Sequence, residues 1–350
     1  MSSLFYVMTM PGLETLAFSE VRAHMPDAEL VKFARGVALF RATATPAQLF
    51  ALRTVEDVFF ALVHIKGLGR GTDALRVLHS ATLNADIAQG LALWRRAHDG
   101  RQPKTWRVVS QKSGTHEFRR VDAGQSVTAA LQRVVPRAMR LAKDEADLEC
   151  WLWLNGSEVL IGLRLSDATM RHRRYKREHM PASLRPTVGA AMSWLARPTP
   201  QDIVLDPLCG AGTLLIERCL LAPYEQASGG DIRAEVVEMA RRNAHAAHVR
   251  APWQVWDARS LPLAEQSVTR ILTNLPFGKQ IGSRETNHAL YTALAQEFRR
   301  VLTSDGLLVT LTSEDRLWDV VLRDHGWRIV KKVVLVVLGQ PASIFVAEQV

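Results

Sequence analysis

A short motif, Thr273-Asn274-Leu275-Pro276-Phe277-Gly278, combines residue types suited to chemistry on an amine. Methylation of an exocyclic amine needs little acid–base assistance, but the amine lone pair must be turned toward the methyl donor. The side-chain oxygen of Asn274 and the backbone carbonyl of Leu275 could accept both amine hydrogens. Pro276 fixes the direction of that carbonyl, and Phe277 could stack on a base taken out of its helix. The alternative is a turn with one core aromatic, so the interpretation depends on a donor site nearby.

Three aspartates upstream of this motif indicate such a donor site. Asp206 ends an apolar run and is followed by a glycine turn that contains Gly210 and Gly212. Glycine lets the backbone approach a ligand where a Cβ would clash. Asp231 follows 25 residues later and Asp257 a further 26, each at the end of a predicted strand. A single aspartate of this kind is more often a turn residue or helix cap, but three with even spacing favour adenosine binding, with Asp231 on the ribose hydroxyls.

The C-terminal half provides the elements that would position these residues. Strands and helices alternate from Thr187 onward at the spacing of a doubly wound parallel sheet. Seven strands are predicted, at 203–206, 226–231, 253–256, 270–274, 307–312, 327–338 and 343–348. Two strands close together at the end of the chain predict an antiparallel final strand.

The N-terminal half predicts two smaller modules. Residues 1–66 show the order βαββαβ, which is that of a ferredoxin-like domain. Residues 67–165 begin with a glycine-rich stretch and form a second α/β module, with a helix over 126–142 and a hairpin at Asn155-Gly156. Residues 166–182 lack apolar periodicity and predict a basic linker before the domain at 183–350.

Most of the excess positive charge lies in one segment. The net charge is +9, and residues 101–180 contain 16 Lys and Arg against 9 Asp and Glu. Such a block is typical of a protein that binds a polyanion, although a solvated basic face is the alternative. Candidate phosphate-binding residues lie on the predicted helix and in the linker: Arg133, Arg137, Arg140, Arg171, Arg173, Arg174, Lys176 and Arg177.

Composition excludes several classes of protein. Apolar residues make up 47% of the chain, which excludes a wholly disordered protein. The run Val333–Leu338 is too short to span a membrane, and no basic residue precedes Arg22, so no signal peptide is expected. The three cysteines show no metal-binding spacing, and His245 and His248 have no third ligand, so we expect no metal. The cysteine pattern is typical of a reduced protein, so we also expect a cytoplasmic location.

The motifs together resemble a known family. The Asp206–Thr213 segment, Asp231, Asp257 and Asn274–Gly278 look like the class I S-adenosylmethionine-dependent N-methyltransferases. The longer strings Asn274–Ser283 and His179–Thr187 resemble a narrower group, the THUMP-domain tRNA guanine-N2 methyltransferases. Leu275 stands where the commoner motif of the family has proline. A leucine at this position still provides the accepting backbone carbonyl.

The resemblance implies an α/β fold with a Rossmann-like class I methyltransferase domain, preceded by a ferredoxin-like domain and a THUMP domain. It implies a monomer that binds the acceptor stem and 3′ end of tRNA and makes N2-methylguanosine, with position 6 as the usual site. The catalytic residues would be Asn274, Leu275, Pro276 and Phe277. Those implied to hold S-adenosylmethionine are Thr187, Asp206, Leu208, Cys209, Gly210, Ala211, Gly212, Thr213, Asp231, Ile232, Asp257, Ala258 and Asn274.

Two alternatives remain open at the level of sequence. The enzyme could methylate another structured RNA site, a DNA adenine or a protein glutamine, of which the basic segment disfavours the protein. A catalytically silent RNA-binding relative is the other alternative, although it predicts a damaged cofactor site and the motifs are intact.

Overall fold

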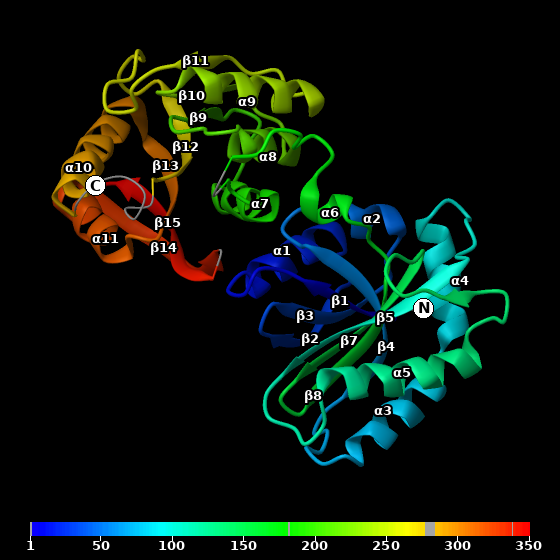
Figure 1. Cartoon of the computed structure of the whole chain (residues 1–350). Helices are drawn as coiled ribbons and strands as arrows, with labels where there is room; N and C mark the ends of the chain where they lie inside the picture. The colour runs from blue at the N-terminus through cyan, green and yellow to red at the C-terminus, as the bar shows by residue number, and fades with distance from the viewer. Residues whose placement is uncertain (1, 181–182, 277–283, 338) are drawn as a thin grey trace. The chain divides into compact units, whose positions relative to one another are not determined.

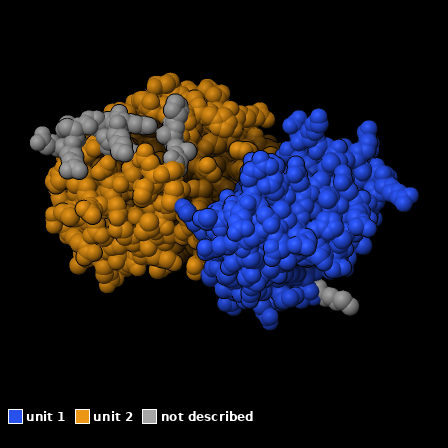
Figure 2. Space-filling model, turned by 60° about the horizontal axis from the view of Figure 1, so that its bottom comes forward, with its two compact units in different colours: residues 1–8, 18–52, 57–167 blue, residues 9–17, 53–56, 168–350 orange. Residues whose placement is uncertain are grey.

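The computed structural model describes residues 2–180, 183–276, 284–337 and 339–350. The chain forms two compact units, coloured separately in Figure 2. Unit 1 contains residues 1–8, 18–52 and 57–167, and unit 2 contains residues 9–17, 53–56 and 168–350. Two short segments from the N-terminal half therefore belong to the unit formed by the C-terminal half.

Unit 1 begins with the predicted order of elements (Figure 1). Its first elements are β1 (Ser3–Met8), α1 (Glu14–His24), β2 (Glu29–Ala34), β3 (Val37–Ala42), α2 (Pro46–Phe50) and β4 (Asp57–Ile65). The predicted cap of α2 is confirmed, because the Thr45 hydroxyl accepts from the Gln48 amide and the Gln48 side chain accepts from the Thr45 amide.

The remaining strands of unit 1 continue the same sheet, and three helices come before or between them in sequence. They are α3 (Ala74–Leu83), α4 (Ile87–Ala97), β5 (Thr105–Ser113), α5 (Arg120–Val134), β6 (Arg140–Leu141), β7 (Leu148–Asn155) and β8 (Glu158–Arg164). All eight strands pair in the order β2-β3-β1-β4-β8-β7-β5-β6. The antiparallel ladder between β4 and β8 joins the strands of the two predicted modules, so no break in the sheet separates them.

The predicted helix over 126–142 was wrong at both ends. Helix α5 begins at Arg120 and ends at Val134. Val135 is extended because it precedes Pro136, whose ring excludes the helical conformation of the residue before it. Arg137 therefore lies beyond the helix, in the segment that leads into β6, and Arg140 is the first residue of β6.

Unit 2 contains the seven-stranded sheet predicted from the sequence. Its elements are α6 (Thr169–His172), α7 (Pro186–Leu195), β9 (Ile203–Asp206), α8 (Thr213–Leu221), β10 (Gln226–Asp231), α9 (Ala234–Ala246), β11 (Trp253–Val255), β12 (Val268–Asn274), α10 (Arg284–Val301), β13 (Leu302–Thr312), α11 (Asp315–Asp324), β14 (Trp327–Val337) and β15 (Gln340–Gln349). The strand order is β11-β10-β9-β12-β13-β15-β14, and β15 is antiparallel to both of its neighbours. This confirms the predicted doubly wound sheet with an antiparallel final strand.

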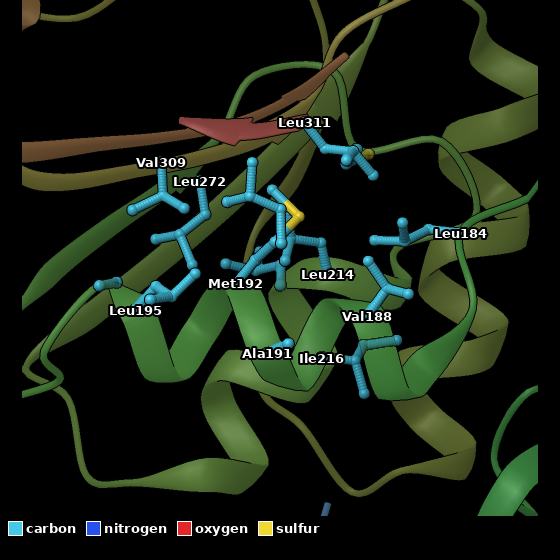
Figure 3. Packing of buried hydrophobic residues seen from close by; sticks show 14 of the residues in the cluster. Leu184, Val188, Ala191, Met192, Leu195, Leu214, Ile216, Leu272, Val309 and Leu311 are labelled. Atoms are coloured by element: carbon cyan, nitrogen blue, oxygen red, sulfur yellow. The ribbon is translucent and has the colours of Figure 1, made fainter. Parts of the chain in front are cut away.

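Helices cover both faces of this sheet because its buried strands are apolar on both sides. Val204 of β9 packs with α7, α8 and α9, whereas the next residue, Leu205, packs with α10 and α11. Figure 3 shows the first of these layers, in which Met192 of α7 and Leu272 of β12 belong to one buried cluster. Among the described residues, no helix is both long enough and apolar enough to cross a membrane.

The N-terminal segment 9–17 packs against the core of unit 2. Met10, Leu13 and Leu16 are buried in the same cluster as Leu335 of β14. Gly12 has a φ of 102°, and a Cβ at this position would lie 2.1 Å from the Val334 carbonyl oxygen. The close approach of the two backbones therefore requires glycine.

We predict that Gly12→Ala destabilises unit 2 by about 2 kcal/mol more than Gly339→Ala does. Gly339 is a matched control in the same unit, because it also has a positive φ but a Cβ there would meet no described atom within 4 Å. Thermal unfolding of both variants measures the difference. Equal melting temperatures would show that the contact with Val334 imposes no constraint.

Candidate active site

The sheet brings the predicted site residues to one edge. The parallel strands β11, β10, β9 and β12 are consecutive neighbours, so their carboxyl ends lie side by side. Asp206 ends β9, Asp231 ends β10 and Asn274 ends β12, whereas Asp257 lies two residues after the end of β11. Ligands of open α/β sheets bind in the crevice at this edge.

The turn between β9 and α8 is held in place by backbone hydrogen bonds. The Cys209 amide donates to the Gly230 carbonyl at 2.8 Å, and the Gly212 amide donates to the Cys209 carbonyl at 2.8 Å. The Gly210 amide donates to Oδ2 of Asp231 at 3.3 Å. Gly210 and Gly212 have φ angles of 51° and 80°, which glycine adopts without strain. The second predicted carboxylate thus also fixes the shape of the glycine turn.

Asp206 is a buried carboxyl group. Asp206 is 1% exposed. Burial raises the pKa of this carboxyl group to about 7, and the negative charge of Asp231 contributes to the rise. The Leu208 amide donates to its Oδ1 at 3.4 Å, which favours the ionised form. The charge of Asp206 can therefore change near neutral pH, and a cationic ligand would favour the ionised form.

The other two aspartates are more exposed and also act in local turns. Oδ1 of Asp231 accepts from the Arg233 amide at 3.1 Å, and the next residue, Ile232, is 60% exposed. The carboxylate of Asp257 accepts from the guanidinium of Arg259, at 2.6 Å for the shortest contact. Hydrogen bonding from Arg259 lowers the pKa of Asp257. An amine at Asp257 would have to compete with Arg259.

Asn274 presents an acceptor that the protein leaves unused. Its Oδ1 is buried and has no hydrogen-bond partner among the described residues. The next residue, Leu275, is buried, and its amide donates to the Leu311 carbonyl at 2.9 Å, which anchors the loop to β13. Phe277 lies outside the described residues. A buried polar atom without a partner is uncommon in proteins and is expected where a ligand supplies the partner.

Two threonine hydroxyls at predicted cofactor positions share this property. Thr187 is the second residue of α7 and Thr213 is the first residue of α8. Both side chains are buried, and neither hydroxyl has a hydrogen-bond partner in the part of the chain that the structure describes. The N-terminus of α8 thus carries an unpaired hydroxyl next to the glycine turn.

The remaining predicted cofactor positions are mostly buried. Cys209, Ala211 and Ala258 are each less than 7% exposed, and Leu208 is half-buried. Burial raises the pKa of the Cys209 thiol well above its ordinary value. Cys209 is therefore a packed side chain, and a thiol with a raised pKa is a weak nucleophile.

The candidate RNA-binding residues divide into two groups. Exposed side chains are those of Arg133, Arg137, Arg140, Arg174 and Arg177, and Arg171 is half-buried. Arg173 and Lys176 instead bind within unit 2. Nε of Arg173 donates to Glu217 at 3.1 Å, and Nζ of Lys176 donates to the Leu184 carbonyl. Because these partners occupy both cations, the prediction that they contact RNA is not supported by their placement.

Metal binding finds no support in the described residues. None of them form a group of three or more His, Cys, Asp or Glu side chains that could hold a metal ion. His245 is exposed on α9, and His248, also exposed, follows α9 with a φ of 56°.

Tertiary contacts add three residues that sequence reasoning missed. Nε1 of Trp256 donates to the Pro207 carbonyl at 3.0 Å and so fixes the start of the glycine turn. Asn243 of α9 donates to the Ala211 carbonyl at 2.9 Å. The hydroxyl of Tyr291, in α10, donates to the Pro276 carbonyl at 2.9 Å. No local spacing signals these roles, because each residue is distant in sequence from the loop that it holds.

Tyr291 positions the loop that follows Asn274. Its hydroxyl also lies 2.9 Å from Oγ1 of Thr312, and its ring makes an edge contact with Trp318. We predict that Tyr291→Phe lowers the free energy of unfolding by about 1–2 kcal/mol, because the Pro276 carbonyl and Thr312 hydroxyl lose a buried partner while the ring contact stays.

Chemical denaturation of Tyr291→Phe and of Thr312→Val provides the measurement. The two changes share one hydrogen bond, so the double variant should lose less stability than the sum of the single variants. Additive losses would show that the hydroxyls do not interact.

Comparison with known proteins gives a match to one family model and matches to individual relatives. Residues 173–340 match the family described as UPF0020, RMKL-like, methyltransferase domain. The chain is 33% identical over 216 residues to the tRNA (guanine(6)-N(2))-methyltransferase THUMP3 of Homo sapiens, a match covering 57% of this chain and 42% of the relative. It is 23% identical over 353 residues to the tRNA (guanine(6)-N2)-methyltransferase of Archaeoglobus fulgidus, covering 92% and 86%.

The solved structure of TrmN from Thermus thermophilus has the same fold. The TM-score is 0.84 at 24% sequence identity, and the alignment covers 100% of both chains. The chain spans about half the length of the mammalian relatives. The match of residues 173–340 to the UPF0020 methyltransferase-domain model and the names of these relatives bear out the resemblance to tRNA guanine-N2 methyltransferases that the sequence motifs indicated.

Proposed function

We propose that this protein transfers a methyl group from S-adenosylmethionine to the exocyclic N2 of a guanosine in tRNA. The observation that carries the proposal is the buried Oδ1 of Asn274, which has no partner among the described residues. It lies at the carboxyl end of β12, next to the strand that leads into the glycine turn. The names of the relatives support guanine N2 as the acceptor.

The residues at the sheet edge fit an adenosyl cofactor. Gly210 and Gly212 permit close approach to the backbone, and Asp231 is placed to accept from the ribose hydroxyls. Asp257 and Ala258 would face the adenine, and Asp206 would hold the amino group of the methionine part. When bound, the cofactor supplies an electrophilic methyl group. The full set proposed to hold it is Thr187, Asp206, Leu208, Cys209, Gly210, Ala211, Gly212, Thr213, Asp231, Ile232, Asp257, Ala258 and Asn274.

The proposed chemistry relies on orientation. Oδ1 of Asn274 and the carbonyl of Leu275 accept the two hydrogens of the guanine amine, which directs its lone pair out of the ring plane. Pro276 and Tyr291 hold the loop so that these acceptors are in place before the base arrives. Phe277 is proposed to stack on the base after it leaves its helix. The positively charged product amine then loses a proton to water.

The proposal extends to the substrate and to the organisation of the chain. Residues 1–66 would be a ferredoxin-like domain, 67–165 a THUMP domain, 166–182 the linker and 183–350 the catalytic domain. The basic segment 101–180 supports a phosphate backbone as partner, with Arg133, Arg137, Arg140, Arg171, Arg174 and Arg177 as contacts. We propose position 6 of the acceptor stem as the target, and the names of the relatives support position 6. We also propose that the protein is a cytoplasmic monomer.

A second RNA substrate has a specific observation in its favour. Two relatives are named U6 snRNA (guanine-N(2))-methyltransferase THUMPD2, and that of Bos taurus is 31% identical over 171 residues. The acceptor amine and the chemistry would be unchanged. Only the RNA that the N-terminal half recognises would differ.

Incubation with labelled S-adenosylmethionine and unmodified tRNA, followed by nucleoside mass spectrometry, tests the proposal. We expect N2-methylguanosine from the wild type and at least about a hundredfold slower transfer by Asn274→Ala, because one of the two amine acceptors is lost. Binding of S-adenosylhomocysteine to this variant should change little. Parallel reactions with U6 snRNA distinguish the two substrates.

Two results would contradict the proposal. Full transfer by Asn274→Ala would remove the role assigned to that residue. Cofactor binding without transfer to either RNA would exclude both proposed substrates.

The raised pKa of Asp206 predicts a pH dependence of cofactor binding. Below pH 7 the buried carboxyl group is mostly neutral, and above pH 7 it is charged and attracts the amino group of the cofactor. The affinity for S-adenosylhomocysteine should therefore rise about tenfold between pH 6 and pH 8. Isothermal titration calorimetry measures it, and Asp206→Asn should bind more weakly with no such rise.

A further inference from the structure

The segment Arg173–Met180, here named the strap, is fastened at its start to helix α8. Oε1 of Glu217 accepts from Nε of Arg173 at 3.1 Å and from the Tyr175 hydroxyl at 2.7 Å. Glu217 is fully buried, and its other oxygen accepts from Arg53. A buried carboxylate with several charge-assisted donors fixes the positions of those donors. The first half of the strap is therefore part of the unit 2 core and not a free arm.

One side chain, Asn243 of α9, fastens the other end of the strap. Its Oδ1 accepts from the amides of Arg177 and Glu178, each at 3.0 Å. Its Nδ2 donates to the Glu178 carbonyl at 3.2 Å and to the Ala211 carbonyl at 2.9 Å. Asn243 is 0% exposed, so these bonds are shielded from water. A single buried amide thus joins the strap to the glycine turn.

The strap then continues alongside the glycine turn. A Cβ at Gly210 would lie 4.0 Å from the Met180 sulfur, an ordinary van der Waals distance. The Gly210 amide is the donor to Asp231, whose carboxylate is proposed to bind the ribose. The strap therefore lies against the same turn that the cofactor would contact.

We propose that the strap is a wall of the cofactor site and that Asn243 is the positioning residue that couples the two. The inference rests on the proposed function, since the site is the one assigned to S-adenosylmethionine. Cofactor binding then favours the ordered strap, and the ordered strap favours cofactor binding, by the same factor. Arg174 and Arg177 are exposed on the strap, so the coupling extends to two cations that we propose as RNA contacts.

The first test uses wild-type protein and S-adenosylhomocysteine. Trypsin cleaves after Arg174 and Arg177, and cleavage there requires the strap to open locally. We expect a saturating concentration of the ligand to slow cleavage at these two sites at least about tenfold. Arg137, exposed in unit 1, is the internal control and should be cleaved at an unchanged rate. Equal slowing at all three sites, or none in the strap, would overturn the inference.

The second test compares variants of two adjacent residues on α9. Asn243→Ala removes all four hydrogen bonds and should weaken S-adenosylhomocysteine binding at least about tenfold. Asn243→Asp keeps the acceptor for the strap amides but in its ionised form cannot donate to the carbonyls of Glu178 and Ala211. It should weaken ligand binding, and strap cleavage without ligand should rise less than in Asn243→Ala. Arg242→Ala removes one surface contact between α9 and Glu178 of the strap, and it should weaken ligand binding less than Asn243→Ala does.

The outcomes separate this inference from the proposed function. Wild-type affinity in both Asn243 variants would overturn the role of Asn243, and the proposed function would stand. A ligand that still protects the strap of Asn243→Ala by the wild-type factor would also overturn it. If wild-type protein binds no S-adenosylhomocysteine, the proposed function fails and the inference fails with it.

Discussion

The parallel pairing of four neighbouring strands is the constraint on which the rest of the site depends. Strands β11, β10, β9 and β12 run in one direction, so the residues that follow them must meet at one edge. The glycine turn after β9 then closes on β10 through the hydrogen bonds from Cys209 and Gly210. The order of strands alone brings together residues that are up to 68 positions apart, from Asp206 to Asn274.

Two features of the candidate site have a cost in stability. Asp206 is buried with a raised pKa, and Oδ1 of Asn274 has no partner among the described residues. Both features oppose folding. They are held in place by contacts outside the site, such as those of Trp256 with Pro207 and of Tyr291 with Pro276. Fixed acceptors and a fixed turn remove the need for reorganisation when the substrate arrives.

Features set by local sequence signals could be predicted, whereas features set by contacts between distant parts of the chain could not. Strands β9 and β10 were predicted with their observed bounds, because a buried apolar or small-residue strand followed by aspartate and turn residues is a local signal. The helix over 126–142 was misplaced because the effect of Pro136 on Val135 was overlooked, although that signal was present. The roles of Arg173 and Lys176 could not be predicted, because Glu217 and the Leu184 carbonyl reach them only through the tertiary fold. The same reason explains why Asn243 and Tyr291 were missed.

The ladder between β4 and β8 has a consequence for how this protein can be divided or recombined. Residues 57–65 pair with β1 on one side and with residues 158–164 on the other. A fragment that stopped at residue 66 would leave one edge of β4 unpaired, with Phe59 and Phe60 beside it, and such edges recruit other strands. The first 66 residues are therefore unsuited to transfer as a separate module. The smallest piece of the N-terminal half that keeps this pairing is the whole eight-stranded sheet. A cut after residue 167 would still take residues 9–17 and 53–56 away from unit 2, so neither half can be separated at a single point without loss.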